Sequence, residues 1–275
     1  MDTWQRWLHR WDAQQEVYIE QRERIYTVMF ELLAQLAPPD MRVLDLAAGP
    51  GAVSKRLLEQ FPQASCVALD VDPVLLAVGQ GALGDMGGRL QWLQADLRDP
   101  DWYDQLVAAK GRDVNRDRSD DRDRVESVGG DGVFDVVVSS TATHWLLPAE
   151  LTGVYARLAD LLTDTGVFIN ADGMPMAANH QRILASVRVL GQQRQTKALA
   201  AGDGEHWDDW WDALRQEPTL AVAFAERDQI FPPGSRSHRT APSVQFQQAA
   251  LREAGFGEVA PVYQDLTHHL MLALR

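Results

Sequence analysis

The chain has 275 residues, of which 45% are hydrophobic, and 26 lysines and arginines stand against 39 aspartates and glutamates. The formal net charge of -13 argues against a broad nucleic-acid surface, because lysine and arginine supply most contacts to a phosphate backbone. The single cysteine, Cys66, excludes a disulfide within the chain and fits a cytoplasmic location. We see no secretory leader and no apolar run approaching the ~18 residues of a membrane span.

The first segment is helical in pattern. Apolar side chains in residues 3–37 recur at spacings of three, four or seven, which is typical of amphipathic helices, and Pro38 ends the pattern. We expect residues 1–40 to form a helical lid over the site described next, with Tyr18 or Arg24 in contact with the ligand. A structural helix that only packs on the core is the alternative.

Residues 41–61 predict a buried strand, a tight turn and a helix. Apolar residues surround Asp45, the turn contains Gly49 and Gly51, and apolar positions at helical spacing follow. Such a turn brings backbone N–H groups and a helix amino terminus close to a bound ligand. Asp45 places a carboxylate beside this turn.

Four further strands alternate with helical patterns. They are expected at residues 65–70, 90–96, 134–140 and 167–170. Strands separated by helices indicate βαβ units and a parallel sheet. The first two of these strands end in acids, Asp70 and Asp96.

The alternation stops after the fifth strand and resumes near the end of the chain. Helical patterns are expected at residues 181–199 and 205–226, the second split by Pro218. Two apolar runs, 259–263 and 269–273, close the chain. The connection between them is short enough only for antiparallel strands, so the last strand should run antiparallel to the sheet.

Residues 110–132 are densely charged and nearly free of apolar side chains, so we expect a disordered insertion there. The predicted core is then formed by residues 41–173 and 243–275, interrupted by this insertion. Residues 174–242 are expected to form a helical cap inserted between the fifth and sixth strands.

Acidic side chains should gather at one edge of the sheet. In open α/β sheets ligands bind outside the carboxyl ends of the strands, where Asp45, Asp70, Asp96 and the loop Ser139–Trp145 are expected. A carboxylate can accept both hydroxyl hydrogens of a ribose, and Asp70 follows Gly51 at about the ~20-residue offset usual for that role. The pattern predicts a ligand with ribose hydroxyls, an adenine amine and a positive charge.

The segment Asp45–Gly51, together with Asp70, Asp96 and the strand around Asp135–Val138, resembles the class I S-adenosylmethionine-dependent methyltransferase family, small-molecule type. The resemblance implies an α/β, Rossmann-like, mostly parallel seven-stranded sheet with an antiparallel last strand, plus a helical cap insertion. It implies S-adenosyl-L-methionine as the cofactor.

The resemblance also implies roles for residues on the nucleoside side. Asp70 would bind the ribose and Val71 would pack on the adenine. Asp96 would bind the adenine amine, with Leu97 beside it.

On the methionine side, the resemblance implies that Gly49 and Gly51 let the chain approach the methionine moiety. Asp45 would act through the turn or through a water near the methionine amine. Ala47 stands where the family often has its first glycine, so a tighter pocket is expected there. Ser139, at the end of the fourth strand, completes the predicted cofactor-binding residues.

Two other functions remain open at this point. An NAD(P)-dependent oxidoreductase would also use Asp70, but the third glycine of its fingerprint would fall at Ser54. A literal match at Gly79–Gly84 follows a helix rather than a strand, and an acid at Asp96 also counts against NAD. A non-catalytic module that keeps the cofactor fold is the third possibility.

The sulfonium methyl group is already activated, so a base is needed only if the acceptor must lose a proton. His144 is the candidate base; the alternative is packing against Trp145. The other histidines are scattered without paired ligand spacing, and no metal is predicted. The stripe of Trp207, Trp210 and Trp211 indicates core packing or aromatic contact with a substrate.

The predicted function is methyl transfer from S-adenosylmethionine to a small organic acceptor, yielding S-adenosylhomocysteine. No nucleic-acid or membrane partner is expected. The acceptor, the methylated atom and the oligomeric state are left open.

Overall fold

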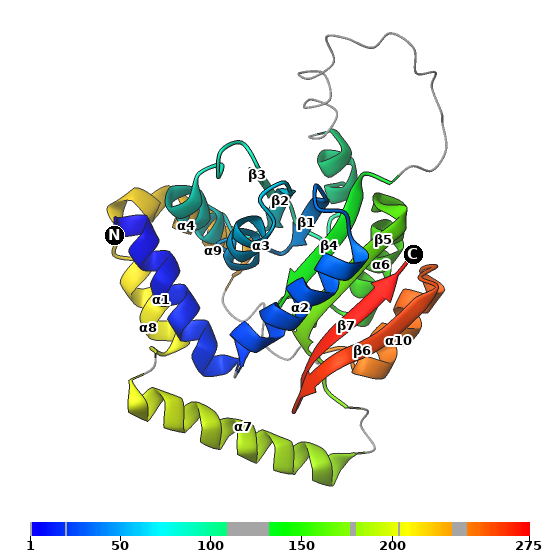
Figure 1. Cartoon of the computed structure of the whole chain (residues 1–275). Helices are drawn as coiled ribbons and strands as arrows, with labels where there is room; N and C mark the ends of the chain where they lie inside the picture. The colour runs from blue at the N-terminus through cyan, green and yellow to red at the C-terminus, as the bar shows by residue number, and fades with distance from the viewer. Residues whose placement is uncertain (1, 20, 109–131, 177–179, 203, 233–240) are drawn as a thin grey trace, which may run out of the picture.

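The structure is built on seven strands that form one sheet. Their bounds in this computed structural model are β1 Arg42–Leu46, β2 Ser65–Asp70, β3 Leu90–Gln94, β4 Phe134–Ser140, β5 Leu162–Gly173, β6 Glu258–Asp265 and β7 His268–Leu274. The spatial order is β3-β2-β1-β4-β5-β7-β6 (Figure 1). Neighbours from β3 to β5 pair in parallel, and β7 is antiparallel to both β5 and β6. The predicted fold class, with its antiparallel last strand, is confirmed.

The structure describes residues 2–19, 21–108, 132–176, 180–202, 204–232 and 241–275. The predicted charged insertion lies outside the described residues, apart from its last residue. The division into lid, core and cap stays a prediction. No helix in the described part of the chain is long and apolar enough to cross a membrane.

Helices and short 3-10 turns make up the rest of the fold. They are α1 Thr3–Tyr18, α2 Arg22–Leu36, α3 Ala52–Gln60, α4 Pro73–Leu83, η1 Thr143–Trp145, α6 Pro148–Leu161, α7 Gln181–Ala201, α8 Trp207–Leu214, η2 Pro218–Leu220, α9 Ala221–Ile230 and α10 Val244–Glu253. The predicted amino-terminal helical segment forms two helices, because Gln21 takes a φ of 59° between them. Pro218 splits the later segment as expected and begins η2.

Helices cover both faces of the sheet, and β1 shows how the sequence divides between them. Leu44 and Leu46 point to the cluster formed with α6 and α10. Val43, on the opposite side of the pleat, joins the cluster formed with α2 and α3. A strand buried on both faces is apolar throughout, which explains the continuous apolar runs of the parallel strands.

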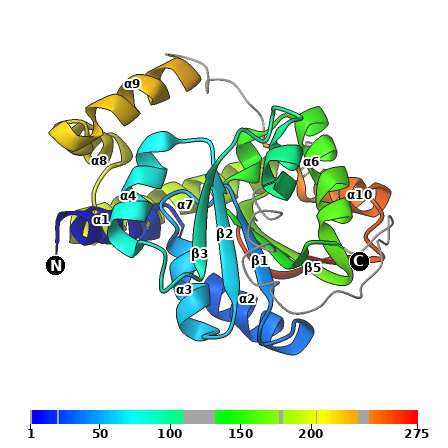
Figure 2. The same ribbon diagram turned by 90° about the horizontal axis from the view of Figure 1, so that it is seen from above.

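A third cluster joins α1, α4, α8 and α9 beside the β3 end of the sheet (Figure 2). Its centre is aromatic: the ring of Trp210 lies 5.0 Å from the rings of both Trp11 and Trp211. Trp210 is fully buried, so this member of the predicted tryptophan stripe belongs to the core. In contrast, α7 has no buried residue.

The glycine pattern inside α4 has a packing explanation. A Cβ on Gly79 would overlap the ring of Trp92 and lie 2.8 Å from the carbonyl oxygen of Pro50. A Cβ on Gly81 would overlap the ring of Trp4. The literal fingerprint match in this helix therefore reflects two tryptophans that need room, and not a nucleotide-binding loop.

We predict that Gly79→Ala destabilises the protein by about 1–3 kcal/mol, because the methyl group would be forced into a filled space. The matched control is Gly191→Ala in α7, where nothing lies within 4 Å of the added Cβ. That control should be neutral, or more stable by about 0.4–1 kcal/mol. Denaturant unfolding of both variants measures the effect, and equal free energies of unfolding would contradict the packing explanation.

Candidate functional site

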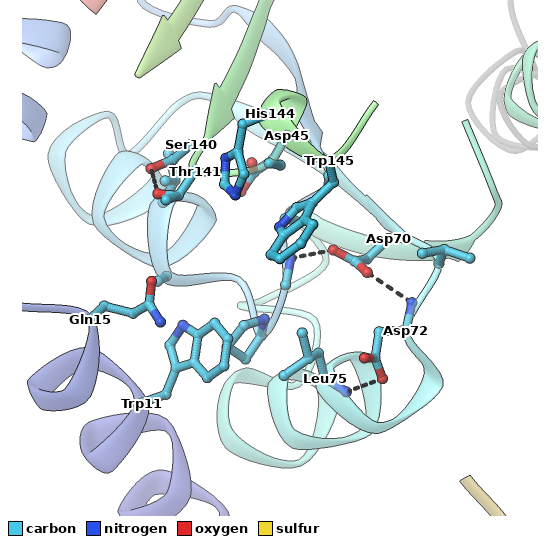
Figure 3. A pocket seen from close by; sticks show the side chains of 18 of the residues that line it. Trp11, Gln15, Asp45, Asp70, Asp72, Leu75, Ser140, Thr141, His144 and Trp145 are labelled. Atoms are coloured by element: carbon cyan, nitrogen blue, oxygen red, sulfur yellow. Dashed lines mark hydrogen bonds between the residues drawn. The ribbon is translucent and has the colours of Figure 1, made fainter. Parts of the chain in front are cut away.

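A cavity of about 600 Å³ lies at the carboxyl ends of the central strands. Figure 3 shows side chains from the strand ends and from α1 converging on it. Most of the predicted cofactor-binding residues line this cavity, namely Asp45, Ala47, Gly49, Asp70, Val71, Asp96 and Leu97. The predicted convergence of the three strand-end acids on one cavity is therefore present.

Asp70, at the end of β2, ties two loops together (Figure 3). Its carboxylate accepts a hydrogen bond of 2.7 Å from the backbone N–H of Gly49 and one of 2.8 Å from that of Asp72. The side chain is buried, with 7% exposure of the residue. A carboxylate oxygen can accept more than one hydrogen bond, and Asp70 lines the cavity, where a ligand hydroxyl would reach it.

Asp45, at the end region of β1, has one oxygen without a partner. Its Oδ2 accepts bonds from the backbone N–H of Ser54 at 3.0 Å and from the Ser54 hydroxyl at 2.6 Å. Its Oδ1 is buried and has no hydrogen-bond partner among the described residues. Burial raises the pKa of Asp45 from its ordinary 3.8 to about 7, against the opposing effect of the Ser54 bonds. Such a carboxyl suits a nearby cationic ligand group, which would stabilise its ionised form.

The glycine turn differs in detail from the prediction. Gly51 does not line the cavity: it has a φ of 79°, caps the amino end of α3, and leaves room for the ring of Trp92. Ala47 takes a φ of 58°, in the left-handed region that favours glycine. Ser54 occupies the position where a dinucleotide-binding fingerprint would have its third glycine, and here it donates both hydrogen bonds to Asp45.

Ser139, which was also predicted to bind the cofactor, is not among the residues that line the cavity. Its hydroxyl donates to the carbonyl oxygen of Leu46 at 2.9 Å, and the residue is fully buried between strands. Since alternate strand residues face opposite ways, the next residue, Ser140, lines the cavity instead. The Ser140 hydroxyl lies 3.1 Å from that of Tyr26 on α2.

Asp96, just after β3, is held by Arg98. The guanidinium Nε of Arg98 donates to Asp96 Oδ1 at 2.9 Å, and both residues line the cavity beside Val71 and Leu97. The carboxylate that was predicted to bind the adenine amine, Asp96, is therefore already paired with Arg98. The apolar side chains of Val71 and Leu97 line the same cavity.

His144 lies in η1 and lines the cavity, and it is paired with a residue that the sequence reasoning missed. Its Nδ1 is 2.7 Å from Oδ1 of Asp172 in β5. Asp172 Oδ2 accepts bonds from the backbone N–H of His144 at 2.9 Å and the hydroxyl of Thr143 at 2.6 Å. Burial alone would raise the pKa of Asp172, but the His144 charge and these hydrogen bonds outweigh it and lower the pKa. His144 also packs on Trp145, at 4.8 Å between ring centres.

Behind this pair, a buried polar network fixes its geometry. Asn170 donates to the hydroxyl of Thr143 at 2.8 Å and to Gln247 on α10 at 3.1 Å. The Tyr155 hydroxyl donates to the same Gln247 oxygen at 2.6 Å. The Oδ1 of Asn170 has no hydrogen-bond partner among the described residues, but the bonds of its amide nitrogen connect Thr143 to Gln247. Because Thr143 also donates to Asp172, these bonds help to hold Asp172 against His144.

Aromatic side chains from the helices form the remaining wall. Trp11, Tyr18, Trp207, Trp211 and Phe231 line the cavity. The backbone N–H of Trp207 donates to the hydroxyl of Tyr18 at 2.9 Å, which joins α8 to α1. Of the two lid residues predicted to touch a ligand, Tyr18 is in the wall, and Arg24 is not among the lining residues.

An ion pair links the later helices to the same edge. The Nε of Arg227 on α9 donates to Oδ2 of Asp72 at 2.7 Å, and the guanidinium lies 3.8 Å from the centre of the Trp211 ring. Asp72 also caps α4 through the backbone N–H of Val74 at 3.1 Å. Among the described residues, no group of three or more histidine, cysteine, aspartate or glutamate side chains could hold a metal ion.

Known methyltransferases are similar to this chain in sequence. Residues 44–168 match the family described as "Methyltransferase domain". The chain is 26% identical over 259 residues to a malonyl-[acyl-carrier protein] O-methyltransferase of Geobacter sulfurreducens, covering 92% of this chain and 80% of that protein. It is 32% identical over 91 residues to a trans-aconitate 2-methyltransferase of Streptomyces avermitilis, covering 32% and 34% of the two chains.

Solved structures show the same fold. An O-methyltransferase family protein from Burkholderia thailandensis superposes with a TM-score of 0.52 at 16% identity, covering 98% of this chain and 61% of that one. The PH0226 protein from Pyrococcus horikoshii OT3 superposes with a TM-score of 0.51 at 14% identity, covering 94% and 95%.

We predict that Asp45→Asn flattens the dependence of stability on pH. With a pKa of about 7 in the folded state and 3.8 as the ordinary value, folded Asp45 keeps a proton that the unfolded chain releases between these pH values. Wild-type stability should therefore fall as pH rises through this window. Urea unfolding should show the variant gaining about 1–3 kcal/mol on wild type between pH 5 and pH 8. An unchanged difference at the two pH values would contradict the raised pKa.

Proposed function

We propose that the chain is a class I S-adenosylmethionine-dependent methyltransferase that methylates an oxygen atom of a small organic acceptor. The observation that carries this proposal is the His144–Asp172 pair, which lies in the wall of the same cavity as the three strand-end acids. One side of the cavity suits the donor, and the other suits the removal of a proton.

The residues at the ends of β3, β2 and β1 support binding of the adenine, the ribose and the amino-acid end of the cofactor, in that order. S-adenosylmethionine, when bound, supplies a methyl group activated by a sulfonium sulfur. Asp96 and Leu97 at the β3 end would hold the adenine, with Val71 packing on it. Asp70 at the β2 end would accept the ribose hydroxyls. Asp45, whose Oδ1 is unpaired among the described residues, would face the positively charged amino-acid end.

The acceptor side supports a small molecule. The wall is formed by aromatic side chains from α1 and α8 and by the loop after β4, which together surround one cavity. The two relatives compared above are named for acting on malonyl-[acyl-carrier protein] and trans-aconitate. Both names denote carboxylic acids, so an oxygen nucleophile is the simplest expectation for this chain.

His144 is the proposed base for an acceptor with a hydroxyl group. Asp172 accepts the Nδ1 hydrogen, which sets the tautomer and directs Nε2 to take the acceptor proton. With the cofactor bound, the acceptor oxygen would take the methyl group as the carbon–sulfur bond breaks, and His144 would take the hydroxyl proton. Asp172 stabilises the resulting imidazolium without itself being protonated. A carboxylate acceptor would need no base, and His144 would then orient it by donating a hydrogen bond.

An acceptor screen tests the proposal. The protein is incubated with S-adenosylmethionine and a series of malonyl thioesters, tricarboxylic acids, phenols and aliphatic alcohols, and S-adenosylhomocysteine release is followed. We expect release with at least one small oxygen nucleophile, and loss of release when its oxygen is blocked as an ether or ester. Turnover confined to nucleic acids or protein side chains would contradict the small-molecule proposal.

We predict that Asp172→Asn lowers kcat for a hydroxyl acceptor by about 10²–10⁴-fold, the usual contribution of a positioned base. Asp172 acts through His144, so cofactor affinity should stay unchanged, and the acid limb of the kcat–pH profile should move to lower pH. The same substitution should have a much smaller effect with a carboxylate acceptor. Equal losses for both acceptor types would show that Asp172 serves only the fold.

A further inference from the structure

Arg22, at the start of α2, is a buried cation in the wall of the cavity. The residue is 3% exposed. Its Nη1 donates to Oδ1 of Asp12 at 2.8 Å, whereas its Nε has no hydrogen-bond partner among the described residues. A buried guanidinium with an unpaired N–H is costly, so this position suits an anionic ligand group that would supply the missing acceptor.

The place of Arg22 in the cavity indicates which ligand group that is. Its guanidinium lies 4.9 Å from the centre of the Tyr26 ring. The hydroxyl of Tyr26 is 3.1 Å from that of Ser140 at the end of β4. The proposed adenine and ribose contacts belong to β3 and β2, on the other side of β1. Arg22 is therefore at the end of the cavity that the amino-acid part of the donor would reach.

The charges in the cavity wall agree with this placement. Among the residues that the structure describes, Arg22 and Arg98 are the arginines that line the cavity, and no lysine lines it. Arg98 is engaged by Asp96 at the β3 end. At the other end, Asp45 offers a negative group and Arg22 a positive one, which matches an amino acid that carries both an ammonium and a carboxylate group.

Arg22 is also held in place before any ligand arrives. Asp12 on α1 pairs with Arg22 and with Arg56, whose Nη1 is 3.2 Å from Asp12 Oδ2. Arg56 is fixed in turn by Glu23 at 2.6 Å and donates to the carbonyl oxygen of Ala52 in the first turn of α3 at 2.9 Å. This ion cluster joins both amino-terminal helices to the helix that follows the glycine turn.

We propose that Arg22 binds the carboxylate of the donor's methionine moiety and thereby couples the amino-terminal helices to cofactor binding. The assignment rests on the proposed function, because it assumes that the donor lies in the order adenine, ribose, methionine from β3 to β4. It makes α1 and α2 a part of the cofactor site, beyond their role as cover for the acceptor.

The test compares two ligands on the same protein preparations by calorimetry: S-adenosylhomocysteine and its decarboxylated form, which lacks only the carboxylate. Wild type should bind the first on the order of 10- to 100-fold more tightly, as for a hydrogen bond to a charged group. Arg22→Met should reduce this ratio to about one, and Arg22→Lys, which keeps the charge, should retain part of it. Because the ratio uses one preparation, partial loss of folded protein does not change it.

The matched control is Arg10→Met. Arg10 lies on α1 and pairs with Glu205 at 2.6 Å, but it does not line the cavity. This control should keep the full wild-type ratio. A wild-type ratio preserved in Arg22→Met, with both ligands weakened equally, would overturn the assignment and make Arg22 a structural residue. Unchanged affinities in both Arg22 variants would overturn it too, and failure of wild type to bind either ligand would overturn the proposed function itself.

Discussion

The carboxylate of Asp70 holds the glycine turn and the loop after β2 in one arrangement, and the site depends on it. Its two backbone hydrogen bonds, to Gly49 and Asp72, join the ends of neighbouring strands. Asp72 continues the chain of contacts, since it caps α4 and binds Arg227 on α9. A ligand bound to Asp70 would therefore contact a carboxylate that is hydrogen-bonded to the glycine turn and, through Asp72, connected to α9.

A second buried carboxylate, Asp172, plays the corresponding part on the other side of the cavity. It fixes η1 and the ring of His144, and a polar network reaching Gln247 fixes it in turn. In the proposed function, the donor would lie along the ends of β3, β2 and β1 with its amino-acid end toward β4, and the acceptor would lie beside His144 and the aromatic wall. Methyl transfer requires only that the site hold both ligands in line and exclude water. The aromatic wall supplied by α1 and α8 provides that enclosure.

The sequence predicted the sheet and the strand-end acids because both follow from local patterns: apolar runs, glycine turns and an acid at each strand end. The bounds of β4 were predicted as the structure has them, but which of its last two serines faces the cavity depends on the pleat of the folded strand. Arg22 was missed because its partners lie on other helices. Asp172 was missed although it obeys the same strand-end rule as Asp70, since the fifth strand extends further than its apolar run. The glycines of α4 resemble a nucleotide-binding motif in sequence, and the packing of Trp92 against Gly79 and of Trp4 against Gly81 shows their role.

A crystal structure of the chain with S-adenosylhomocysteine would show the order in which the donor lies along the strand ends. We expect the adenine beside Asp96 and Leu97, the ribose hydroxyls on Asp70, and the amino-acid end beyond Asp45 toward β4. A purine at the β4 end, or a ligand bound outside this cavity, would contradict this expectation.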